Sequence, residues 1–311
     1  MENNFIKIYA NFLKKRIQPQ KKLKVVFDCS NGAVGPTIKK LQITNPKLQI
    51  YLINEKPDGN FPGHGPDPWA KGAMEQLQKE VLRQKADLGV IFDADGDRVF
   101  FIDNLGCPVE PDIIARLLIW HLKPRKAVYD IRAGWLIKKL KIENLKLKTS
   151  RVGHFYIKKL MRKIGADLGV EKSGHYYFAI RNFDKGELYY DSGILAAIEI
   201  INAVSKLPYS LANFIDLLPQ YYRSGEINIK SQILNLKSQK LFKEIERKLK
   251  IQNLKFKINV SHLDGLTMEF LDYWFNIRPS NTEPLIRLNM EAEDKKILEK
   301  KKKELIKLLK N

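Results

Sequence analysis

Three aspartates recur at every second position of the segment F-D-A-D-G-D-R at 92–98, directly after an apolar run. In a small loop, Asp93, Asp95 and Asp97 would repel one another strongly unless a cation neutralised them. Mg²⁺ prefers oxygen ligands of this kind, and loops at the carboxyl ends of strands in α/β sheets commonly bind ligands. A solvated acidic turn is the alternative, but the place of the segment favours a Mg²⁺ site. Arg98 stands where an EF-hand calcium loop needs glycine, which excludes that motif.

A second polar segment, G-V-E-K-S-G-H at 169–175, contains residue types that bind sugars. Glu171 and Ser173 can hydrogen-bond to sugar hydroxyls, and Gly174 permits close approach of the backbone. His175 can serve as a general acid or base near neutral pH. Taken alone, the segment is more typical of a polar turn with a surface histidine, so it needs support from other motifs.

A third segment, R-P-S-N-T-E-P-L-I-R at 278–287, combines two arginines with small polar residues. Arg278 can grip a phosphate through two parallel hydrogen bonds. Ser280, Asn281 and Thr282 add hydroxyl, amide and backbone N–H donors around the same anion. A capped turn is the alternative, because these small residues also favour turns. The flanking arginines favour a phosphate site.

The elements that position the aspartates are strands and helices in alternation. Apolar runs predict buried strands at 23–28, 88–92 and 98–103. Helical periodicity predicts helices at 5–17, 36–41 and 69–86. A stretch rich in proline and glycine predicts a long loop at 56–68. This alternation predicts an α/β layer with a mostly parallel sheet.

A second α/β unit is predicted from about Pro108, and a smaller α+β unit from about Gly225. The second unit has predicted helices at 112–122, 134–140, 156–166 and 191–206, with strands at 127–131 and within 169–180. The helix at 191–206 has Asp191 or Ser192 as its cap. The last unit has predicted helices at 237–250 and at the lysine-rich C-terminus, with strands near 254–260, 267–271 and 274–278.

Composition limits the partners. The 311 residues carry 55 Lys and Arg against 35 Asp and Glu, a formal charge of +20. Most of the surplus is lysine along helices, as at 138–142 and 299–310, which is typical of solvated faces. Without aromatic stacking platforms, this charge does not predict a nucleic-acid partner. No run of about twenty apolar residues predicts a membrane span. The absence of a signal-peptide pattern, with Cys29 and Cys107 as the only cysteines, favours the cytoplasm.

The order of the three motifs resembles that of the α-D-phosphohexomutase superfamily, in its phosphomannomutase/phosphoglucomutase branch. The metal loop of that family is DGDGDR, its sugar loop GEMSGH or GEQSGH, and its phosphate loop R-x-SNTEP. Further similar stretches are DCSNGAVGP at 28–36, FPGHGPDP at 61–68 and RVGHFYIKKLM at 151–161. The resemblance covers nearly the whole chain. It implies two consecutive α/β/α domains followed by a smaller α+β domain.

The resemblance also implies a role for each matching residue. The implied Mg²⁺ ligands are Asp93, Asp95 and Asp97. The implied catalytic residues are Arg98, Arg132 and His175. The implied sugar-binding residues are His154, Glu171 and Ser173. The implied ligands of the phosphate that is not transferred are Arg278, Ser280, Asn281 and Thr282. Arg132 stands where many members have lysine, and arginine keeps its proton far more firmly. Ala94 and Val170 replace glycines, which matters only where the backbone needs a positive φ.

Family members have a first domain with a phosphorylated serine in a motif such as TASHNP, and no serine here lies in such a motif. The resemblance therefore implies a connecting helix from a missing first domain at 1–20, α/β domains at 21–106 and 107–222, and an α+β domain at 223–311. In the family, the phosphoserine and a hexose 1- or 6-phosphate exchange phosphoryl groups through a bisphosphate. The chain is then expected to be inactive alone, unless a separately encoded N-terminal domain supplies the serine.

Other functions stay open at this point. V-I-F-D-A-D-G-D at 90–97 is similar to the DxDGT motif of haloacid-dehalogenase-like phosphatases, with Asp93 as nucleophile and Asp95 as acid/base. Against it, Asp97 replaces the threonine, and a strand rather than a helix is predicted to follow. A non-catalytic phosphosugar-binding or polyanion-binding protein is the third possibility. Glu171 and Ser173 do not discriminate mannose from glucose.

Overall fold

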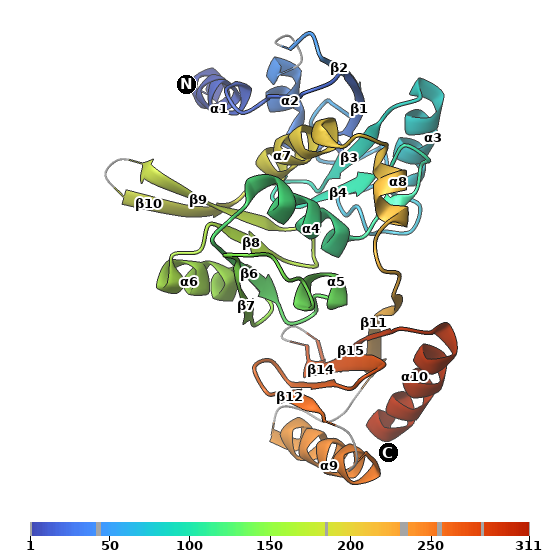
Figure 1. Ribbon diagram of the computed structural model, residues 1–311. Coiled ribbons are helices and arrows are strands. Elements are labelled where there is room, and N and C mark those ends of the chain that lie inside the picture. The colour runs from blue at the N-terminus through green and yellow to red at the C-terminus, as the bar shows by residue number, and fades with distance from the viewer. Residues whose placement is uncertain are drawn as a thin grey trace. The chain divides into compact units, whose positions relative to one another are not determined.

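The computed structural model describes residues 2–41, 45–183, 186–230, 236–253, 257–280 and 283–310. The chain forms two compact units. The first unit comprises Met1–Tyr129, Lys141–Lys148 and His154–Leu218, and the second comprises Asp130–Leu140, Thr149–Gly153 and Pro219–Asn311. Three five-stranded sheets run through these units (Figure 1). Within the described ranges, no helix has the length and apolarity that a bilayer crossing requires.

The first sheet carries the predicted metal loop. Its strand order is β2 (Leu48–Ile53), β1 (Leu23–Asp28), β3 (Leu88–Phe92), β4 (Val99–Ile102) and β5 (Pro108–Val109). The first three strands are parallel, whereas β4 and β5 are antiparallel to their neighbours. The prediction of a mostly parallel sheet was therefore wrong. Residues 93–98 are too short for the crossover that a parallel pair needs, so β3 and β4 form a hairpin.

Helices α1 (Glu2–Lys14), α2 (Gly35–Leu41) and α3 (Glu75–Gln84) belong to the same part of the chain. Leu77 and Val81 of α3 pack against Ile91 and Phe100 of the sheet. Burial of each such side chain stabilises the fold by about 1.5–3 kcal/mol. The predicted helix at 69–86 begins only at Glu75, because Gly72 has a φ of +84° that a right-handed helix cannot contain.

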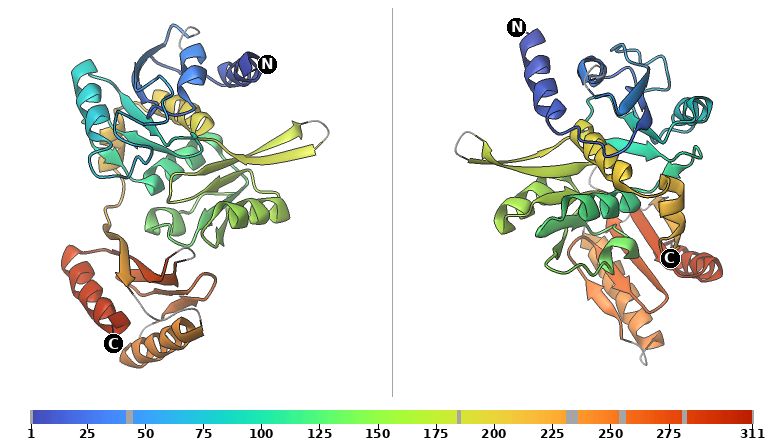
Figure 2. Two further views of the ribbon diagram at one scale, coloured as in Figure 1. Left: turned by 180° about the vertical axis from the view of Figure 1, so that it is seen from behind. Right: turned by 45° about the horizontal axis from the view of Figure 1, so that its top comes forward.

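The second sheet is ordered β10 (Gly186–Asp191), β9 (Tyr176–Phe183), β8 (Leu168–Val170), β6 (Lys126–Asp130) and β7 (Lys146–Ser150). The helices of this part are α4 (Pro111–Leu122), α5 (Trp135–Lys138), α6 (His154–Ile164), α7 (Gly193–Lys206) and α8 (Leu211–Asp216). Ser192 caps α7, with its Oγ accepting from Leu195 N at 3.1 Å. Nearly every residue of α7 is buried, because it contacts both α4 and the first-sheet strands β3 and β4 (Figure 2).

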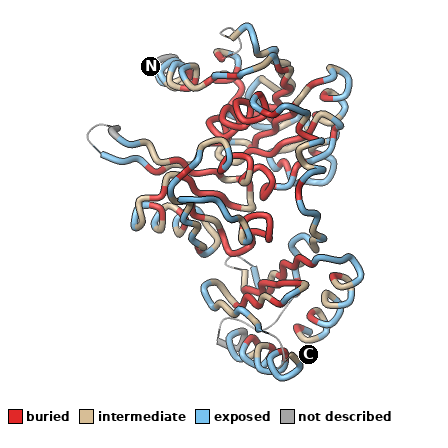
Figure 3. Tube along the Cα trace, in the orientation of Figure 1, coloured by how far each residue is buried: buried red, intermediate tan, exposed pale blue. Residues whose placement is uncertain are grey.

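The third sheet is antiparallel, with the order β11 (Tyr222–Lys230), β15 (Leu285–Ala292), β14 (Tyr273–Pro279), β13 (Leu266–Glu269) and β12 (Asn259–Ser261). Apolar residues of α9 (Leu236–Gln252) and α10 (Lys295–Lys310) share one core with Phe275 and Leu288 of the sheet. The outer faces of both helices are exposed (Figure 3). The predicted α+β class is confirmed, and the lysines of α10 lie mainly on its outer side, as predicted. Residues 254–256 of a predicted strand lie outside the described residues, and the proposed domain boundaries stay predictions.

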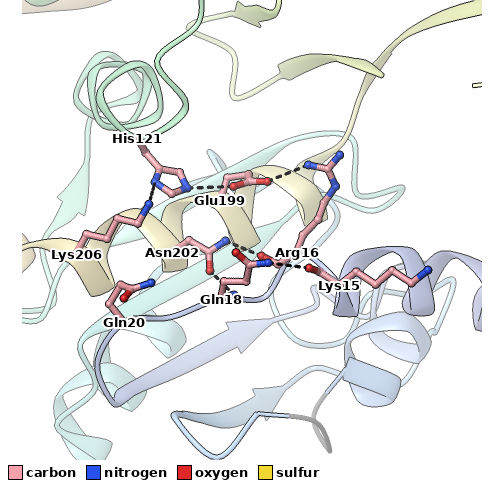
Figure 4. A pocket seen from close by; sticks show the side chains of 8 residues that line it. All are labelled: Lys15, Arg16, Gln18, Gln20, His121, Glu199, Asn202 and Lys206. Atoms are coloured by element: carbon pink, nitrogen blue, oxygen red, sulfur yellow. Dashed lines mark hydrogen bonds and ion pairs between the residues drawn. The ribbon is translucent and has the colours of Figure 1, made fainter. Parts of the chain in front are cut away.

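A segment after α1 is fixed along α7 by side chains rather than by a sheet (Figure 4). Buried Asn202 accepts from Gln18 N at 2.8 Å and donates to Arg16 O at 2.7 Å. Glu199 accepts from Arg16 Nη1 at 3.4 Å and lies 3.1 Å from His121 Nε2. The side-chain amide of Asn202 thus makes the hydrogen bonds to Arg16 and Gln18 that a neighbouring strand would make in a sheet.

We expect Asn202→Ala to lower the free energy of unfolding by about 1–3 kcal/mol, because two backbone groups would lose their partners. Thermal or urea denaturation measures this change. Gln18→Ala is the matched control, since it removes an exposed side chain of the same pocket and keeps the N–H that Asn202 accepts. Equal stability of the two variants would contradict the prediction.

Candidate functional site

The three predicted metal ligands converge in the turn between β3 and β4. One carboxylate oxygen from each of Asp93, Asp95 and Asp97 lies within 4.8 Å of the others. Asp97 Oδ1 is buried and has no hydrogen-bond partner, as expected of an atom that needs a further ligand. Carboxylate oxygens are also the kind of ligand that hard cations such as Mg²⁺ prefer. These residues therefore fit a divalent cation.

The backbone of this turn is shaped by small residues. Gly96 has a φ of +80°, and a Cβ there would lie 2.1 Å from Val34 Cγ1. The N–H groups of Gly96 and Arg98 both donate to Asp93 Oδ1 at 3.1 Å. Ala94 is not among the described residues with positive φ, so its methyl group adds no backbone strain.

Charges within the turn are only partly balanced. Arg98 Nε donates to Asp93 Oδ2 at 2.6 Å, and Arg98 Nη1 lies 3.6 Å from Asp67 Oδ1. Burial raises the pKa of Asp93 to about 6, although Arg98 acts in the opposite direction. Hydrogen bonding to His175 holds the pKa of Asp97 below its usual value. At neutral pH the turn therefore offers ionised oxygens to a cation.

The predicted sugar segment is the turn between β8 and β9. Gly174 N–H donates to Glu171 O at 3.1 Å, and Gly174 has a φ of +91°. Ser173 Oγ and His175 Nδ1 are hydrogen-bonded at 3.0 Å. Buried Glu171 accepts from Tyr177 OH at 2.8 Å, which fixes its carboxylate. A carboxylate, a hydroxyl and an imidazole are thereby held in one short loop.

Backbone contacts join the metal and sugar turns. Val99 N–H donates to Gly174 O at 3.0 Å, and Arg98 and His175 form an isolated antiparallel bridge. His175 Nε2 lies 3.3 Å from Asp97 Oδ2, and Nδ1 lies 3.6 Å from Glu171 Oε2. Burial alone would lower the pKa of His175, but these two carboxylates outweigh it and raise the pKa. His175 can therefore hold a proton between the carboxylates of the two turns.

Some of the predicted site residues do not lie in either of these turns. His154 is the exposed first residue of α6, and no described hydrogen bond links it to either turn. Asn281 and Thr282 lie outside the described residues. Ser280 is described, and its N–H donates to Leu285 O at 2.9 Å, which closes the loop between β14 and β15.

The second unit brings Arg132 and Arg278 to one carboxylate of β11. Glu226 Oε2 accepts from Arg278 Nη2 at 3.1 Å and lies 3.9 Å from Arg132 Nη1. Arg287 Nη1 donates to Glu226 Oε1 at 2.9 Å. Arg132 is also held by buried Asp130, with Nη2 2.9 Å from Oδ2. The roles predicted for Arg132 and Arg278 stay predictions. Arg287 was counted only as one of the arginines that favour phosphate, and Glu226 was assigned no role.

Each missed residue left a different signal. Arg287 ends the motif at 278–287 and was available as a second cation for the same anion. Glu226 is more than fifty positions away from both arginines of that motif, and only the pairing of β11 with β15 brings it there. No spacing rule could identify it.

Fold and turns together define a class: consecutive α/β and α+β domains with an aspartate turn beside a polar turn, in a fold similar to that of a solved member of the α-D-phosphohexomutase superfamily. Three sequence models of one family match successive segments, described as phosphoglucomutase/phosphomannomutase α/β/α domain II at 4–106, α/β/α domain III at 110–222 and the C-terminal domain at 196–308. The chain belongs to the phosphoglucomutase/phosphomannomutase family. Membership of this family excludes the haloacid-dehalogenase alternative, and so does the strand β4 that follows the aspartate turn.

Individual relatives agree with this family. The chain is 36% identical to a phosphomannomutase of Methanocaldococcus jannaschii over 98% of its own length, and it spans 65% of that relative. A phosphoglucomutase/phosphomannomutase family protein from Burkholderia thailandensis has a similar structure, with a TM-score of 0.78, 23% identity, and coverage of 98% of this chain and 64% of that one. The N-acetylphosphoglucosamine mutase of Aspergillus fumigatus, solved with GlcNAc-6P and magnesium, has a TM-score of 0.67, 14% identity, and coverage of 99% and 65%.

We expect Gly174→Ala to lower the free energy of unfolding by about 3 kcal/mol, from a positive φ together with overpacking. A Cβ at this position would lie 2.4 Å from the ring of buried Phe100. Gly165→Ala is the control, because Gly165 also has a positive φ but a Cβ there would meet no atom within 4 Å. Its cost should be about 1 kcal/mol in the same denaturation assay. Equal losses would show that the contact with Phe100 is unimportant.

The loop at 56–68 is anchored to β1 by a buried ion pair. His64 Nε2 lies 3.2 Å from Asp28 Oδ2, and both side chains are almost inaccessible. The contact with Asp28 raises the pKa of His64, although burial acts against it. Asp67 of the same loop faces Arg98 of the metal turn, so this anchor also supports the site.

The raised pKa of His64 predicts a pH-dependent stability. Protonated His64 stabilises the folded chain below the ordinary histidine pKa of about 6.5, and this contribution is lost as pH rises through the raised value. In the wild type, we therefore expect the thermal midpoint to fall as the pH rises above about 6.5. In His64→Gln, this fall should be smaller. His262→Gln, which breaks an exposed pair with Glu246, should leave the profile unchanged. Parallel profiles for wild type and His64→Gln would contradict the prediction.

Proposed function

We propose that the chain is the metal-, sugar- and phosphate-binding part of a phosphohexomutase. Such an enzyme is an isomerase that moves a phosphoryl group between the 1- and 6-positions of a hexose phosphate. One observation carries the proposal. Backbone hydrogen bonds join a turn with three aspartates to a second turn that holds a carboxylate, a hydroxyl and a histidine. A surface that binds polyanions would not need these two turns to be joined.

The proposed roles follow from the contacts. Bound to Asp93, Asp95 and Asp97, Mg²⁺ would neutralise charge on the transferred phosphoryl group. Arg98 would hold that group, since only one edge of its guanidinium is engaged by Asp93. Glu171 and Ser173 would bind sugar hydroxyls, and His154 is proposed as a further sugar contact. His175, with its raised pKa, would donate a proton or hydrogen bond to a reacting oxygen.

The phosphate that is not transferred is proposed to bind at the loop after β14. Arg278 and Ser280 would hold it, with Asn281 and Thr282. Arg132, which the resemblance placed among the catalytic residues, is locked to Asp130 and lies beside Arg278. We therefore infer that it acts through its fixed positive charge rather than by proton transfer.

In this proposal the phosphoryl donor is a phosphoserine of the kind that the first domain of the family carries. Ser30, beside the metal turn, is buried and donates its hydroxyl proton to Phe92 O, so it is not a free nucleophile. Support for the ligands comes from the Aspergillus enzyme, whose structure contains GlcNAc-6P and magnesium. The free thiols of Cys29 and Cys107 support the cytoplasm as the place of action.

Calorimetric titration of glucose 1-phosphate and mannose 1-phosphate into the purified chain tests the proposal. We expect Mg²⁺-dependent binding that EDTA abolishes. Asp95→Asn should weaken Mg²⁺ binding roughly tenfold or more, because an exposed ligand is lost without harm to the core. Arg278→Ala should weaken phosphosugar binding by roughly tenfold or more. Asp216→Asn, an exposed change on α8, should change neither.

Three outcomes would count against the proposal. Binding that ignores Arg278→Ala would exclude the phosphate loop. Salt-sensitive binding of any polyanion that also ignores Asp95→Asn would favour the polyanion-binding alternative. Conversion of glucose 1-phosphate by the chain alone would contradict the separate phosphoserine donor.

A further inference from the structure

A polar cavity lies at the carboxyl end of α7, where this helix faces the last turn of α4 and the segment that follows α1 (Figure 4). Its volume is about 200 Å³. Such a cavity has room for more than one water molecule, but it is smaller than the roughly 300–1,000 Å³ of pockets that enclose drug-sized ligands. Each residue of its lining is polar or charged. A ligand of this cavity would therefore be small and hydrophilic.

The buried acceptors of the cavity already have partners. Glu199 Oε1 accepts from Arg16 Nη1 at 3.4 Å, and Oε2 lies 3.1 Å from His121 Nε2. His121 Nδ1 lies 3.2 Å from Lys206 Nζ and accepts from it, because an ammonium group can only donate. His121 Nε2 therefore carries the hydrogen that Glu199 accepts. The side-chain oxygen of Asn202 is occupied by the backbone of the segment after α1.

Donors, by contrast, remain unused. In the described part of the chain, Lys206 Nζ makes one of the three hydrogen bonds that it can donate, and Arg16 donates through Nη1 alone. The side-chain amide of Gln20 also has no partner among the described residues. The lining holds three cations, Lys15, Arg16 and Lys206, against the carboxylate of Glu199, a net formal charge of +2. Lys15 points away from Lys206 in Figure 4, which leaves Lys206, Gln20 and Arg16 as the donors for an anion.

Helix ends alone do not account for this surplus. His121 and Lys206 lie in the last turns of α4 and α7, where the helix dipole favours cations. That preference explains a lysine at the end of α7, but it does not explain Arg16 and Gln20, which come from the segment after α1. The same dipoles oppose an anion, so we expect binding of modest affinity that depends on a doubly charged ligand.

We propose that this cavity binds a phosphate group, free or carried by a small hydrophilic metabolite, with Lys206 and Gln20 as donors and Arg16 as a further cation. A phosphate monoester carries nearly two negative charges at neutral pH, which matches the surplus charge of the lining. The inference is independent of the proposed function. The aspartate turn meets α7 at Gly193, about 20 Å along the helix from Lys206. A bound phosphate would tie α4, α7 and the segment after α1 together.

Calorimetric titration of inorganic phosphate into the full chain tests the inference. The chain carries Arg278→Ala, which removes the phosphate loop of the proposed function, and EDTA keeps cations from the aspartate turn. In this background, Lys206→Gln should weaken phosphate binding roughly tenfold, because a charged donor is lost. Gln20→Glu should weaken it at least as much, because a carboxylate would face the phosphate. Both positions are exposed, so both variants should keep the fold.

Two controls make the same charge changes outside the cavity. Lys163→Gln removes an exposed lysine of α6, and Gln239→Glu adds a carboxylate to the exposed side of α9. Each should change phosphate binding by less than about twofold, because exposed charges at a distance are screened. Glycerol 3-phosphate, titrated in parallel, distinguishes the two sources of the group. Tighter binding than that of inorganic phosphate would identify a phosphorylated metabolite, and equal binding would identify free phosphate.

Thermal unfolding gives a second readout. Saturating phosphate should raise the midpoint of the Arg278→Ala chain, and this rise should be smaller when Lys206→Gln or Gln20→Glu is added. The absence of phosphate binding in the Arg278→Ala background would overturn the inference and leave the proposed function untouched. Equal weakening by the cavity variants and the two controls would also overturn it, because phosphate would then respond only to net charge.

Discussion

The hydrogen bond from Val99 N–H to Gly174 O is the constraint on which the candidate site depends. It fastens the turn after β3, from the first sheet, to the turn after β8, from the second. A further bond from Gly193 N–H to Gly96 O adds the start of α7 to the same junction. Binding groups must be held to a fraction of an ångström by rigid elements. The candidate cation turn and the candidate sugar turn therefore inherit their relative position from backbone geometry.

The charged residues that produce the net charge of this chain are not the ones that form its candidate sites. The surplus of lysine that produces +20 lies largely on solvated helix faces such as the outer side of α10. The charges that can do chemistry are few, and they form two clusters. Asp93, Arg132 and Arg278 are buried, whereas Asp97, His175 and Glu226 are partly exposed. Burial strengthens each of these interactions, because less water screens them. Net charge is therefore a poor guide to the ligands of this protein.

Sequence patterns predicted those parts of the structure that depend on local residues. The strands before Asp93 and the clustering of three aspartates follow from an apolar run and an alternating spacing, and both are confirmed. Strand β4 was predicted, but its antiparallel direction follows from the shortness of the turn. Strands β2, β11 and β15 were not predicted. Strands β11 and β15 mix apolar with polar residues, whereas β2, with the sequence LQIYLI, is apolar enough to have been identified. Glu226 illustrates the limit: its role depends on strand register, which no local spacing encodes.

The position of α7 has a consequence for synthesis of the chain on the ribosome. Asn202 and Ser205 hold the backbone of Gln18 and Gln20, which are made more than 180 residues earlier. At a usual elongation rate, that interval lasts roughly 10–40 s. From their own synthesis until that of α7, β3, β4 and α4 lack the helix that packs against them in the folded chain. The first unit therefore completes its folding only after α7 has been synthesised.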